Sequence, residues 1–462
     1  MGSYAPLVTV YIVNHNYGSY LLQSINSVLD QTLQNFELII IDNGSTDGSR
    51  SVIESFGQHN KILTVFQENL GLSAANNIAL GRASGRYLIR LDADDFLDIH
   101  ALEVLSGILD RDREVGLVFP DFYLTDSDGN ILKTVRRQDI SKASLLDLPA
   151  HGACTMIRRE CLRALEGYDE TYKCQDGWDL WLRFIENYGV QNVNLPLFYY
   201  RQHGDNLSSD KSRLFSTRAE IFNKRVKQNK EPLDCIAVVP VRGSGVEPSS
   251  YALRPLGGKP LLDWTLEAAI TAKRVSRILV TSPDEEILDH VTTKFPNKVV
   301  AVRRDWNLAT LSSPLDESLT ELFEHLNNDW RTFDAVSVLY IESPFRSARY
   351  IDMAVDVLDV FNLNQVVGMY REDAFFYHHN GHGMKPVHAS ENIQNELEDL
   401  YRRSGGLFVI RRGHWFRDIA SAPHVGHVEL DEAAALKLQS KWSWKIAEMH
   451  ALELMQKDML NE

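Results

Sequence analysis

The sequence predicts an α/β protein built from two domains, on three observations. Its 462 residues exceed the roughly 100–200 residues of a single domain. Apolar residues make up 44% and charged residues 24%, a composition typical of globular proteins with sizeable cores. Short apolar runs alternate with stretches of helical periodicity, and this alternation restarts near the middle of the chain, as expected for two sheets covered by helices.

In the first half, each short apolar run is expected to form a buried strand. The predicted strands are Val8–Asn14, Leu38–Asp42, Ile62–Gln67 and Tyr87–Leu91. Between the first two, the sequence predicts a helix over Ser19–Gln31. Its apolar residues recur with the spacing of one helix face, so this face should pack on the sheet; they are Leu21, Ile25, Val28 and Leu29.

A polar, basic stretch separates the two halves. Residues 216–233 are expected to form a linker helix that ends near Pro232. A second series of predicted strands follows: Cys235–Pro240, Ile278–Thr281, Val299–Val302, Ala335–Tyr340, Gln365–Met369 and Gly406–Ile410. The predicted domains are therefore residues 1–215 and residues 234–462.

Charge and composition exclude several classes of partner. Lys and Arg number 48 against 63 Asp and Glu, so the formal net charge is −15, the wrong sign for nucleic acid or an anionic membrane surface. No run approaches the roughly 18 apolar residues of a transmembrane helix, and the N-terminus does not resemble a signal peptide. The four cysteines show no CxxC spacing, so we expect reduced thiols in a cytoplasmic protein.

Acidic residues follow two of the predicted strands. Asp42 ends the second strand, and Asp92 and Asp94 follow the fourth, at the edge where open α/β sheets bind ligands. In an extended chain Asp92 and Asp94 would project to the same side. Crowded carboxylates favour Mg²⁺ or Mn²⁺ that also holds a diphosphate. The alternative is a surface turn with aspartates that cap helices.

These acidic residues stand within longer motifs: Tyr11–Tyr20, Gln31–Thr32, Ile41–Asp47, Glu68–Asn77, Ala83–Tyr87 and Leu91–Asp95. Over residues 6–215 the sequence strongly resembles the family 2 glycosyltransferases of GT-A fold. The resemblance implies that Asp42 binds the nucleotide base and that Asp92 and Asp94 contact ribose, diphosphate and metal. It also implies donor-binding roles for Asn14 and Asn76. Position 43, often Asp in the family, is Asn here.

The same resemblance suggests the remaining parts of an active site for inverting glycosyl transfer. This reaction needs a general base that takes the proton from the acceptor hydroxyl. Lys173–Arg183 resembles the family's Glu-Asp motif imperfectly, which makes Asp176 the candidate base and Asp179 the next candidate. The alternative for Asp176 is a helix N-cap. In the segment that resembles the family's closing loop, His203 could ligate the metal or hold diphosphate, or it could be a solvated loop histidine.

Over residues 234–450 the chain resembles an acylneuraminate cytidylyltransferase. The nucleotide-like positions are Arg242, Gly243, Ser244, Lys259 and Arg346. Glu247 stands where that family has a Lys, and Lys437, Gln439 and Ser443 replace its metal-binding carboxylates. We therefore expect a catalytically degenerate domain that does not bind CTP with Mg²⁺ tightly. It would instead support a homo-oligomer through exposed apolar residues such as Trp442 and Trp444.

Together the resemblances imply two Rossmann-like α/β domains, a GT-A fold followed by a nucleotidyltransferase-like fold. The implied function is a metal-dependent, inverting glycosyltransferase that moves a sugar from a nucleotide-sugar donor to a glycan or lipid-linked acceptor in surface glycan assembly. Two alternatives remain open. One is a bifunctional enzyme that also activates a nonulosonic acid with CTP, and the other is a non-catalytic scaffold that binds sugar nucleotides.

Overall fold

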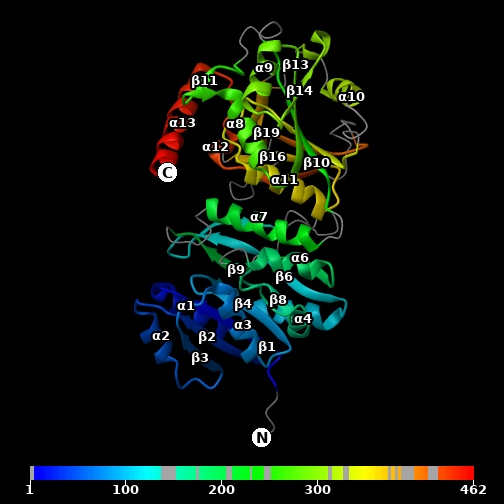
Figure 1. Ribbon diagram of the computed structural model, residues 1–462. Coiled ribbons are helices and arrows are strands. Elements are labelled where there is room, and N and C mark those ends of the chain that lie inside the picture. Colours follow the sequence, from blue (N-terminus) through cyan, green and yellow to red (C-terminus); the bar gives the residue numbers. More distant parts are fainter. Residues whose placement is uncertain are drawn as a thin grey trace. The chain divides into compact units, whose positions relative to one another are not determined.

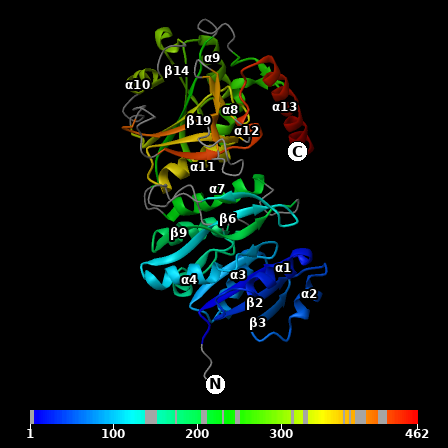
Figure 2. The same ribbon diagram turned by 180° about the vertical axis from the view of Figure 1, so that it is seen from behind.

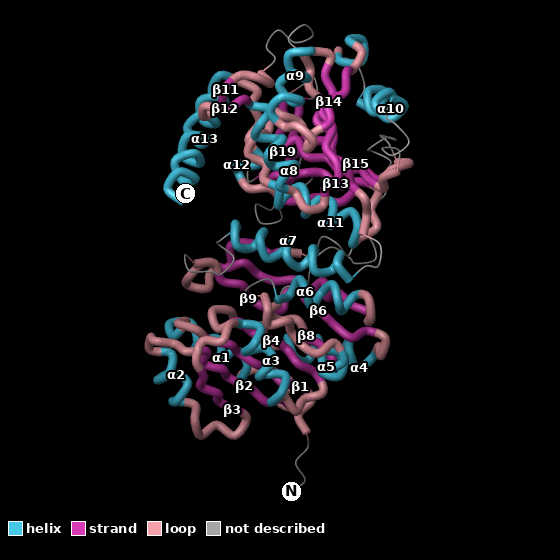
Figure 3. Tube along the Cα trace, in the orientation of Figure 1, coloured by secondary structure: helices cyan, strands magenta, loops and turns pink. Residues whose placement is uncertain are grey.

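The computed structural model describes most of the chain, in segments. These are residues 5–136, 152–172, 176–203, 211–228, 232–243, 251–310, 315–325, 332–372, 376–379, 383–386, 400–414 and 425–461. The chain divides into two compact units: Met1–Arg218 with Phe375–Glu398, and Ala219–Ala374 with Asp399–Glu462 (Figure 1). Each unit contains its own sheet with helices around it (Figure 3). The prediction of two Rossmann-like α/β domains is confirmed.

The sheet of the first unit has the order β3-β2-β1-β4-β8-β6-β9-β5, and β7 pairs with β6. Strands β1 to β4 run parallel, as in a nucleotide-binding sheet. The strands are β1 (Val8–Asn14), β2 (Phe36–Asn43), β3 (Ile62–Gln67), β4 (Tyr87–Asp92), β5 (Phe96–Leu97), β6 (Val115–Thr125), β7 (Ile131–Val135), β8 (Met156–Arg158) and β9 (Gly189–Arg201). The helices are α1 (Gly18–Leu29), α2 (Ser49–Ser55), α3 (Leu72–Arg82), α4 (Ala101–Arg111), α5 (Arg159–Ala164) and α6 (Asp176–Ile185).

Helices cover both faces of this sheet because its central strands are apolar on both sides. Along β2, Leu38 and Ile40 pack into one core and Ile39 and Ile41 into the other. The first core also takes the predicted stripe of α1, namely Leu21, Ile25 and Val28. The four strands predicted in this half are present, and the helix predicted over Ser19–Gln31 spans Gly18–Leu29.

Helix α7 (Lys211–Gln228) stands where the linker helix was expected, with earlier bounds. The division between the two units falls inside it, between Arg218 and Ala219. In the first unit, the Arg218 guanidinium lies 4.7 Å from the Trp178 ring centre. In the second unit, Phe222 packs against Phe361 with 5.7 Å between ring centres. The domain limits of 215 and 234 stay a prediction.

The sheet of the second unit has the order β14-β13-β10-β15-β19-β16-β20. Its strands are β10 (Cys235–Pro240), β13 (Val275–Ser282), β14 (Val300–Arg303), β15 (Ala335–Leu339), β16 (Gln365–Glu372), β19 (Leu400–Arg411) and β20 (Val425–Glu429). This unit also has the short strands β11 (Pro255–Leu256) and β12 (Lys259–Pro260), whereas the short strands β17 (Tyr377–His379) and β18 (Met384–Pro386) fall in the first unit. The helices are α8 (Leu261–Thr271), α9 (Glu285–Lys294), α10 (Leu315–His325), α11 (Ala348–Val360), α12 (Glu432–Ala435) and α13 (Lys441–Asn461), with a 3-10 turn at Trp306–Ala309.

Helix α13 lies at the edge of the second unit in both views (Figures 1 and 2). Its buried side packs on the β11–β12 hairpin, where the Gly257 N–H donates to Glu448 at 3.1 Å. Trp442 is 70% exposed, as expected. The expectation that Trp444 is exposed is wrong, because its ring packs on Tyr251 and lies 4.1 Å from the Arg254 guanidinium.

Among the described residues, no helix is both long enough and apolar enough to cross a lipid bilayer. Three of the four cysteines, Cys154, Cys161 and Cys235, are described, and each is buried and free.

We predict that Gly85→Ala lowers the free energy of unfolding of the first unit by about 1–3 kcal/mol. The added Cβ would lie 2.5 Å from the backbone nitrogen of Thr9, which cannot move without disturbing β1. Calorimetry of the full chain measures the change as a lower unfolding temperature for the first unit.

Gly81→Ala is the matched control, because it lies within α3 and an added Cβ would meet no atom within 4 Å. Alanine there should stabilise the helix by about 0.5–1 kcal/mol. Equal effects of the two substitutions would contradict the close approach at Gly85.

Candidate active site

Asn14 and Asp42 lie side by side at the carboxyl ends of β1 and β2. The strand register pairs them directly, and the Asn14 amide donates to the Asp42 carboxylate at 3.1 Å. The same amide donates to the Ser45 hydroxyl at 2.9 Å. The Asn14 amide oxygen is buried and has no hydrogen-bond partner in the described part of the chain. This oxygen and the second oxygen of Asp42 leave acceptors for a ligand.

Asn43 shows why an amide replaces the acid that is common at this position. Its nitrogen donates to Asn69 at 3.1 Å, and its oxygen accepts from Gln67 at 2.8 Å and from the Leu70 N–H at 3.1 Å. A carboxylate could not donate the first of these hydrogen bonds. Asn43 therefore fixes the loop after β3 beside the site.

The acidic cluster at the end of β4 differs from the expected extended geometry. The Asp95 N–H donates to the Asp92 carbonyl at 3.1 Å, which closes a turn directly after the strand. Arg90 and Asp92, two residues apart on the strand, form an ion pair at 2.9 Å, and Asp94 lies within the turn. The expectation that Asp92 and Asp94 project from one extended strand is therefore wrong, although they remain near enough to interact. Burial, and then the Asp92 carboxylate, raise the pKa of Asp94.

Asp95 is the most buried member of the cluster. One of its carboxylate oxygens accepts from the Arg201 N–H at 2.9 Å, and the other is buried without a hydrogen-bond partner among the described residues. Burial, followed by the Asp94 carboxylate, raises the pKa of Asp95 well above its usual range. Three carboxylates at one strand end thus repel one another and favour a cation.

Arg201, the last residue of β9, ties this cluster to the rest of the unit. Its guanidinium donates to the Asp94 carbonyl at 2.8 Å, to the Ser127 carbonyl at 2.6 Å and to Gln23 at 2.7 Å. It also lies 4.7 Å from the ring centre of Tyr20. Because this side chain is almost fully buried, it holds the turn of the acidic cluster in place.

His203 is no solvated loop residue. Its Nε2 lies 2.9 Å from an oxygen of Asp94, and only 7% of its side chain is exposed. The ring stacks on Tyr20 with 5.1 Å between ring centres and meets Tyr17 edge-on at 5.6 Å. Two aromatic rings at the start of α1 therefore hold this imidazole against the acidic cluster.

Asp94 and His203 offer a carboxylate and an imidazole, which suit Mn²⁺ and are acceptable to Mg²⁺. Among the residues that the structure describes, no group of three or more His, Cys, Asp or Glu side chains surrounds a single metal position. An ion held here would therefore need further ligands, and the oxygens of a diphosphate are the type that Mg²⁺ uses. The residues fit a metal that binds together with such a ligand.

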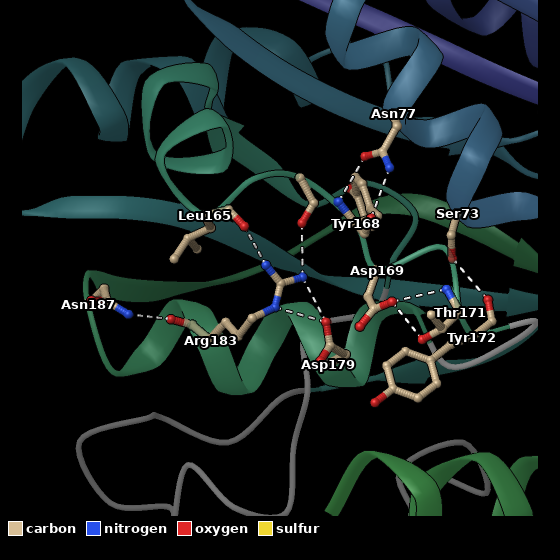
Figure 4. A network of polar contacts seen from close by, with 11 residues as sticks. Ser73, Asn77, Leu165, Tyr168, Asp169, Thr171, Tyr172, Asp179, Arg183 and Asn187 are labelled. Atoms are coloured by element: carbon tan, nitrogen blue, oxygen red, sulfur yellow. Dashed lines mark hydrogen bonds and ion pairs between the residues drawn. The ribbon is translucent and has the colours of Figure 1, made fainter. Parts of the chain in front are cut away.

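Asp179 lies in α6 and forms an ion pair with Arg183 at 2.7 Å (Figure 4). Arg183 also donates to the carbonyls of Leu165 at 2.7 Å and Gly167 at 2.9 Å. Figure 4 shows this network continuing through Tyr168 to Asn77 on α3. Asp179 thus serves to fix α6 beside the segment 165–172.

Asp176 is the first residue of α6, so the network of Asp179 positions the helix turn that carries it. The side chain of Asp176 lies outside the described residues. Asn76 lies on α3 with its side chain fully buried, and its assignment to donor binding rests on the resemblance alone.

In the second unit the structure brings together only part of the nucleotide-like set. Arg242 lines a cavity at the end of β10, and Gly243 follows it, while Ser244 and Glu247 lie outside the described residues. Lys259 does not line this cavity, because its ammonium contacts Glu267 and the Trp264 ring. Arg346 is fully buried and donates to the carbonyls of Gly405 and Gly406. Lys259 and Arg346 are therefore absent from the described lining of this cavity, and their assignment as nucleotide-like positions stays a prediction.

Sequence reasoning missed Arg90, Asp95, Arg201 and the two tyrosines around His203. Arg90 stands two residues before Asp92, and this strand spacing could have predicted their ion pair. Tyr17 and Tyr20 lie within the motif Tyr11–Tyr20, yet no local pattern predicts their contact with His203 or the contacts of Arg201 with the acidic cluster. These contacts depend on how β9 and α1 pack in the fold.

The chain is similar to known protein families over both units. Residues 9–165 match the family described as Glycosyl transferase family 2, and residues 250–358 match the family described as Cytidylyltransferase. The chain is 27% identical to the chondroitin synthase of Escherichia coli over 208 residues, 45% of this chain but only 30% of that relative. Among solved structures, S. aureus TarS 1–349 in complex with UDP-GlcNAc is similar with a TM-score of 0.41 and 16% identity, over 48% of this chain and 68% of that chain.

An uncharacterized glycosyltransferase of Methanocaldococcus jannaschii is 31% identical over 224 residues, which cover 46% of this chain and 77% of that relative. This similarity extends over most of the relative's length, and the family match covers the strands that carry Asn14, Asp42 and Asp92. The chain therefore belongs to glycosyl transferase family 2.

Proposed function

We propose that the chain transfers a sugar from a nucleotide-sugar donor to a glycan or lipid-linked acceptor, with a divalent metal ion and with inversion at the anomeric carbon. The observation that carries this proposal is the gathering of Asn14, Asp42 and the acidic cluster at one edge of the parallel strands. A role in surface glycan assembly and a cytoplasmic location, expected from the sequence, belong to the same proposal.

The donor would lie across the ends of β2, β1 and β4. Asp42 pairs in register with Asn14, and Asp92 with the neighbouring Val13, so the two acids flank β1. Neighbouring strands are about 4.8 Å apart, so Asp42 and Asp92 are separated by about the length of a nucleoside. Asp42 and the Asn14 oxygen would accept hydrogen bonds from the base, and Asp92 would contact the ribose.

Asp94 and His203 are the residues that would hold the metal ion. When bound, Mg²⁺ or Mn²⁺ would neutralise the negative charge of the leaving diphosphate. Arg201 supports this assignment, since it fixes the backbone of Asp94 from a buried position. Tyr20 holds the imidazole of His203 so that little rotamer freedom is lost when the ion binds.

Asp176 is the proposed base. It would take the proton of the acceptor hydroxyl while the acceptor oxygen bonds to the anomeric carbon and the bond from that carbon to the diphosphate oxygen breaks. Its place in the first turn of α6, which Arg183 anchors through Asp179, supports the assignment. Asp179 is less suited to this role because Arg183 already occupies one of its oxygens.

Two alternatives remain for the whole chain. The bifunctional enzyme needs carboxylates for Mg²⁺ in the second unit, and Lys437 lines the cavity there. The non-catalytic scaffold does not explain why three crowded carboxylates are kept against a histidine in the first unit. The proposal of a glycosyltransferase with a degenerate second domain therefore accounts for both sites.

We also propose that the second unit pairs with a second copy of this chain through α13. Four apolar side chains lie on its exposed side at helical spacing: Trp442 (70% exposed), Ile446 (41%), Met449 (67%) and Leu452 (49%). Lys445 and Glu453 lie four residues before and after Met449. Two antiparallel copies of α13 that cross at Met449 would bring each Lys445 beside Glu453 of the partner subunit.

Asp94→Asn should reduce transfer by at least about 100-fold at saturating Mn²⁺ and donor. Mutation of a residue that only orients a metal ligand already costs about 10–100-fold in activity, and loss of a ligand itself should cost more. The unfolding temperature should not fall, since removing one charge from the cluster relieves repulsion. Asp128→Asn, at an exposed turn, is the control and should leave transfer unchanged. Wild-type turnover in Asp94→Asn would show that the metal assignment is wrong.

Asp176→Asn should lower kcat by about 10²–10⁴-fold with nearly unchanged donor affinity, as expected for loss of positioned proton transfer. Turnover and donor binding are measured separately, by steady-state kinetics and by calorimetry.

Asp179→Asn is the comparison variant. It should lower the unfolding temperature, because Arg183 loses the carboxylate that balances its charge in a partly buried position. A collapse of donor affinity in Asp176→Asn would instead make that residue a donor ligand or a structural cap.

Met449→Glu should convert a dimer of the full chain into a monomer in light scattering, because two carboxylates would meet at the crossing point. Leu132→Glu replaces another exposed apolar residue, on β7, and should leave the dimer intact. A monomeric wild-type chain at micromolar concentration would refute the pairing.

A further inference from the structure

A buried cluster of charged residues lies at the amino ends of β10 and β13 in the second unit. Helix α11 carries Asp352, Asp356 and Asp359 at a spacing of four and then three residues, which places them on one helix face. Arg274, in the segment between α8 and β13, lies against all three. Its backbone N–H donates to Asp352 at 2.8 Å, and its guanidinium forms ion pairs with Asp356 and Asp359, each at 2.7 Å.

Asp356 is the most deeply buried of the three carboxylates, with 1% of its surface exposed. Its ion pair with Arg274 lacks hydrogen-bond geometry, so it offsets only part of the cost of burying a charge. Burial, opposed by Arg274 and reinforced by the other two carboxylates, raises the pKa of Asp356 to about 7. Burial also raises the pKa of Asp352.

The charges of this cluster balance only when it holds a proton. Lys273, next to Arg274, is the second cation near Asp352. With all three carboxylates ionised, the cluster has three negative and two positive charges, and one proton makes it neutral. The thiol of Cys235, at the start of β10, stays neutral because burial raises its pKa to about 12. A buried cluster favours the neutral state, and the most buried carboxylate is the one that takes the proton.

Charged groups on the other elements that pack against α11 have contacts of their own. These groups are Asp263 and Glu267 on α8, Glu372 on β16, Arg402 and Arg411 on β19, and His427 on β20. Among them only histidine is a type of side chain that ordinarily titrates near neutral pH. The ring of His427 packs on Tyr401 with 5.4 Å between ring centres. A test must therefore separate Asp356 from His427.

The same cluster holds the segment of chain that follows α7. The Leu233 N–H donates at 3.3 Å to the Asp359 oxygen that Arg274 also contacts. Phe222, on α7, packs against Phe361, the residue after α11. The end of α11 thus contacts this segment at two points. A negative charge on Asp356 would repel Asp359 and compete for Arg274, which would weaken the contact with Leu233.

We propose that Asp356 keeps a proton in the folded chain near neutral pH, and that loss of this proton loosens the end of α11 and the segment that it holds. The second unit would thus respond to pH independently of sugar transfer.

The direction of this response follows from where the proton is bound. The pKa of Asp356 is about 7 in the folded chain against an ordinary value of 3.8, so the folded chain binds a proton that the unfolded chain has already lost. This contribution to stability is complete in acid, falls as the pH rises from about 4 to about 7, and changes no further above that range.

The test uses Asp356→Asn, which imitates the protonated carboxyl at every pH. Calorimetry of the full chain compares the unfolding temperature of the second unit in the variant and in the wild type. The difference, variant minus wild type, should be near zero at pH 5 and reach about 5 °C at pH 8. Other titrating groups are present in both proteins, so their effects cancel in this difference.

Two control variants separate this effect from others. Asp289→Asn, at an exposed position of α9, should give a difference from wild type that does not change with pH. His427→Gln should leave the wild-type fall in place. Exchange of the Leu233 amide hydrogen, corrected for the intrinsic effect of pH, should accelerate from pH 6 to pH 8 in the wild type and not in Asp356→Asn.

Three results would overturn the proposal. An Asp356→Asn variant less stable than the wild type at pH 8 would show that the fold needs the ionised carboxylate. A difference in unfolding temperature that is the same at pH 5 and pH 8 would show that Asp356 does not hold the proton. Exchange at Leu233 that is equal in the two proteins at every pH would show that the proton does not control the segment after α7.

Discussion

Three carboxylates occupy four consecutive residues at the end of β4, and the first unit is arranged around the repulsion between them. Each is balanced from a different part of the chain. Arg90 pairs with Asp92 from the same strand. Arg201, on β9, donates to the Asp94 carbonyl and to the Asp95 carboxylate, and His203 faces Asp94 from beyond β9. Gly152 has no side chain because a Cβ there would lie 2.2 Å from the Arg90 guanidinium. The negative charge of these three carboxylates thus explains why basic residues from distant parts of the sequence face them.

The two units use related α/β sheets with opposite charge at their ligand edges. In the first, excess carboxylate favours a cation that a diphosphate ligand would complete. In the second, the described lining of the cavity after β10 contains five basic residues and one acidic residue. Both sites lie at the carboxyl ends of parallel strands, where the backbone geometry is similar. The chemistry therefore follows the side chains placed there and not the fold itself.

The sequence predicted β1 to β4 of the first sheet and six of the seven strands of the second, because buried parallel strands such as β1, β2 and β10 are short runs of apolar residues with clear ends. It did not predict β5 to β9 or β20. It placed Asp42 and Asp92 at strand ends. It could not predict the turn after Asp92, since a single hydrogen bond from Asp95 decides it. The aromatic contacts of His203, the packing of Trp444 against Tyr251 and the position of Arg346 depend on packing between distant segments, which periodicity does not encode.

We propose that Asp94 and His203 hold a metal ion only together with a diphosphate. Electron paramagnetic resonance of Mn²⁺, titrated into the full chain with and without nucleoside diphosphate, measures this dependence. Mn²⁺ alone should bind weakly, because the described site offers two protein ligands, and it should bind tightly when the diphosphate is present. His203→Ala should abolish that gain. Mn²⁺ binding that does not change with the diphosphate, or with loss of His203, would show that these residues do not hold the ion in this way.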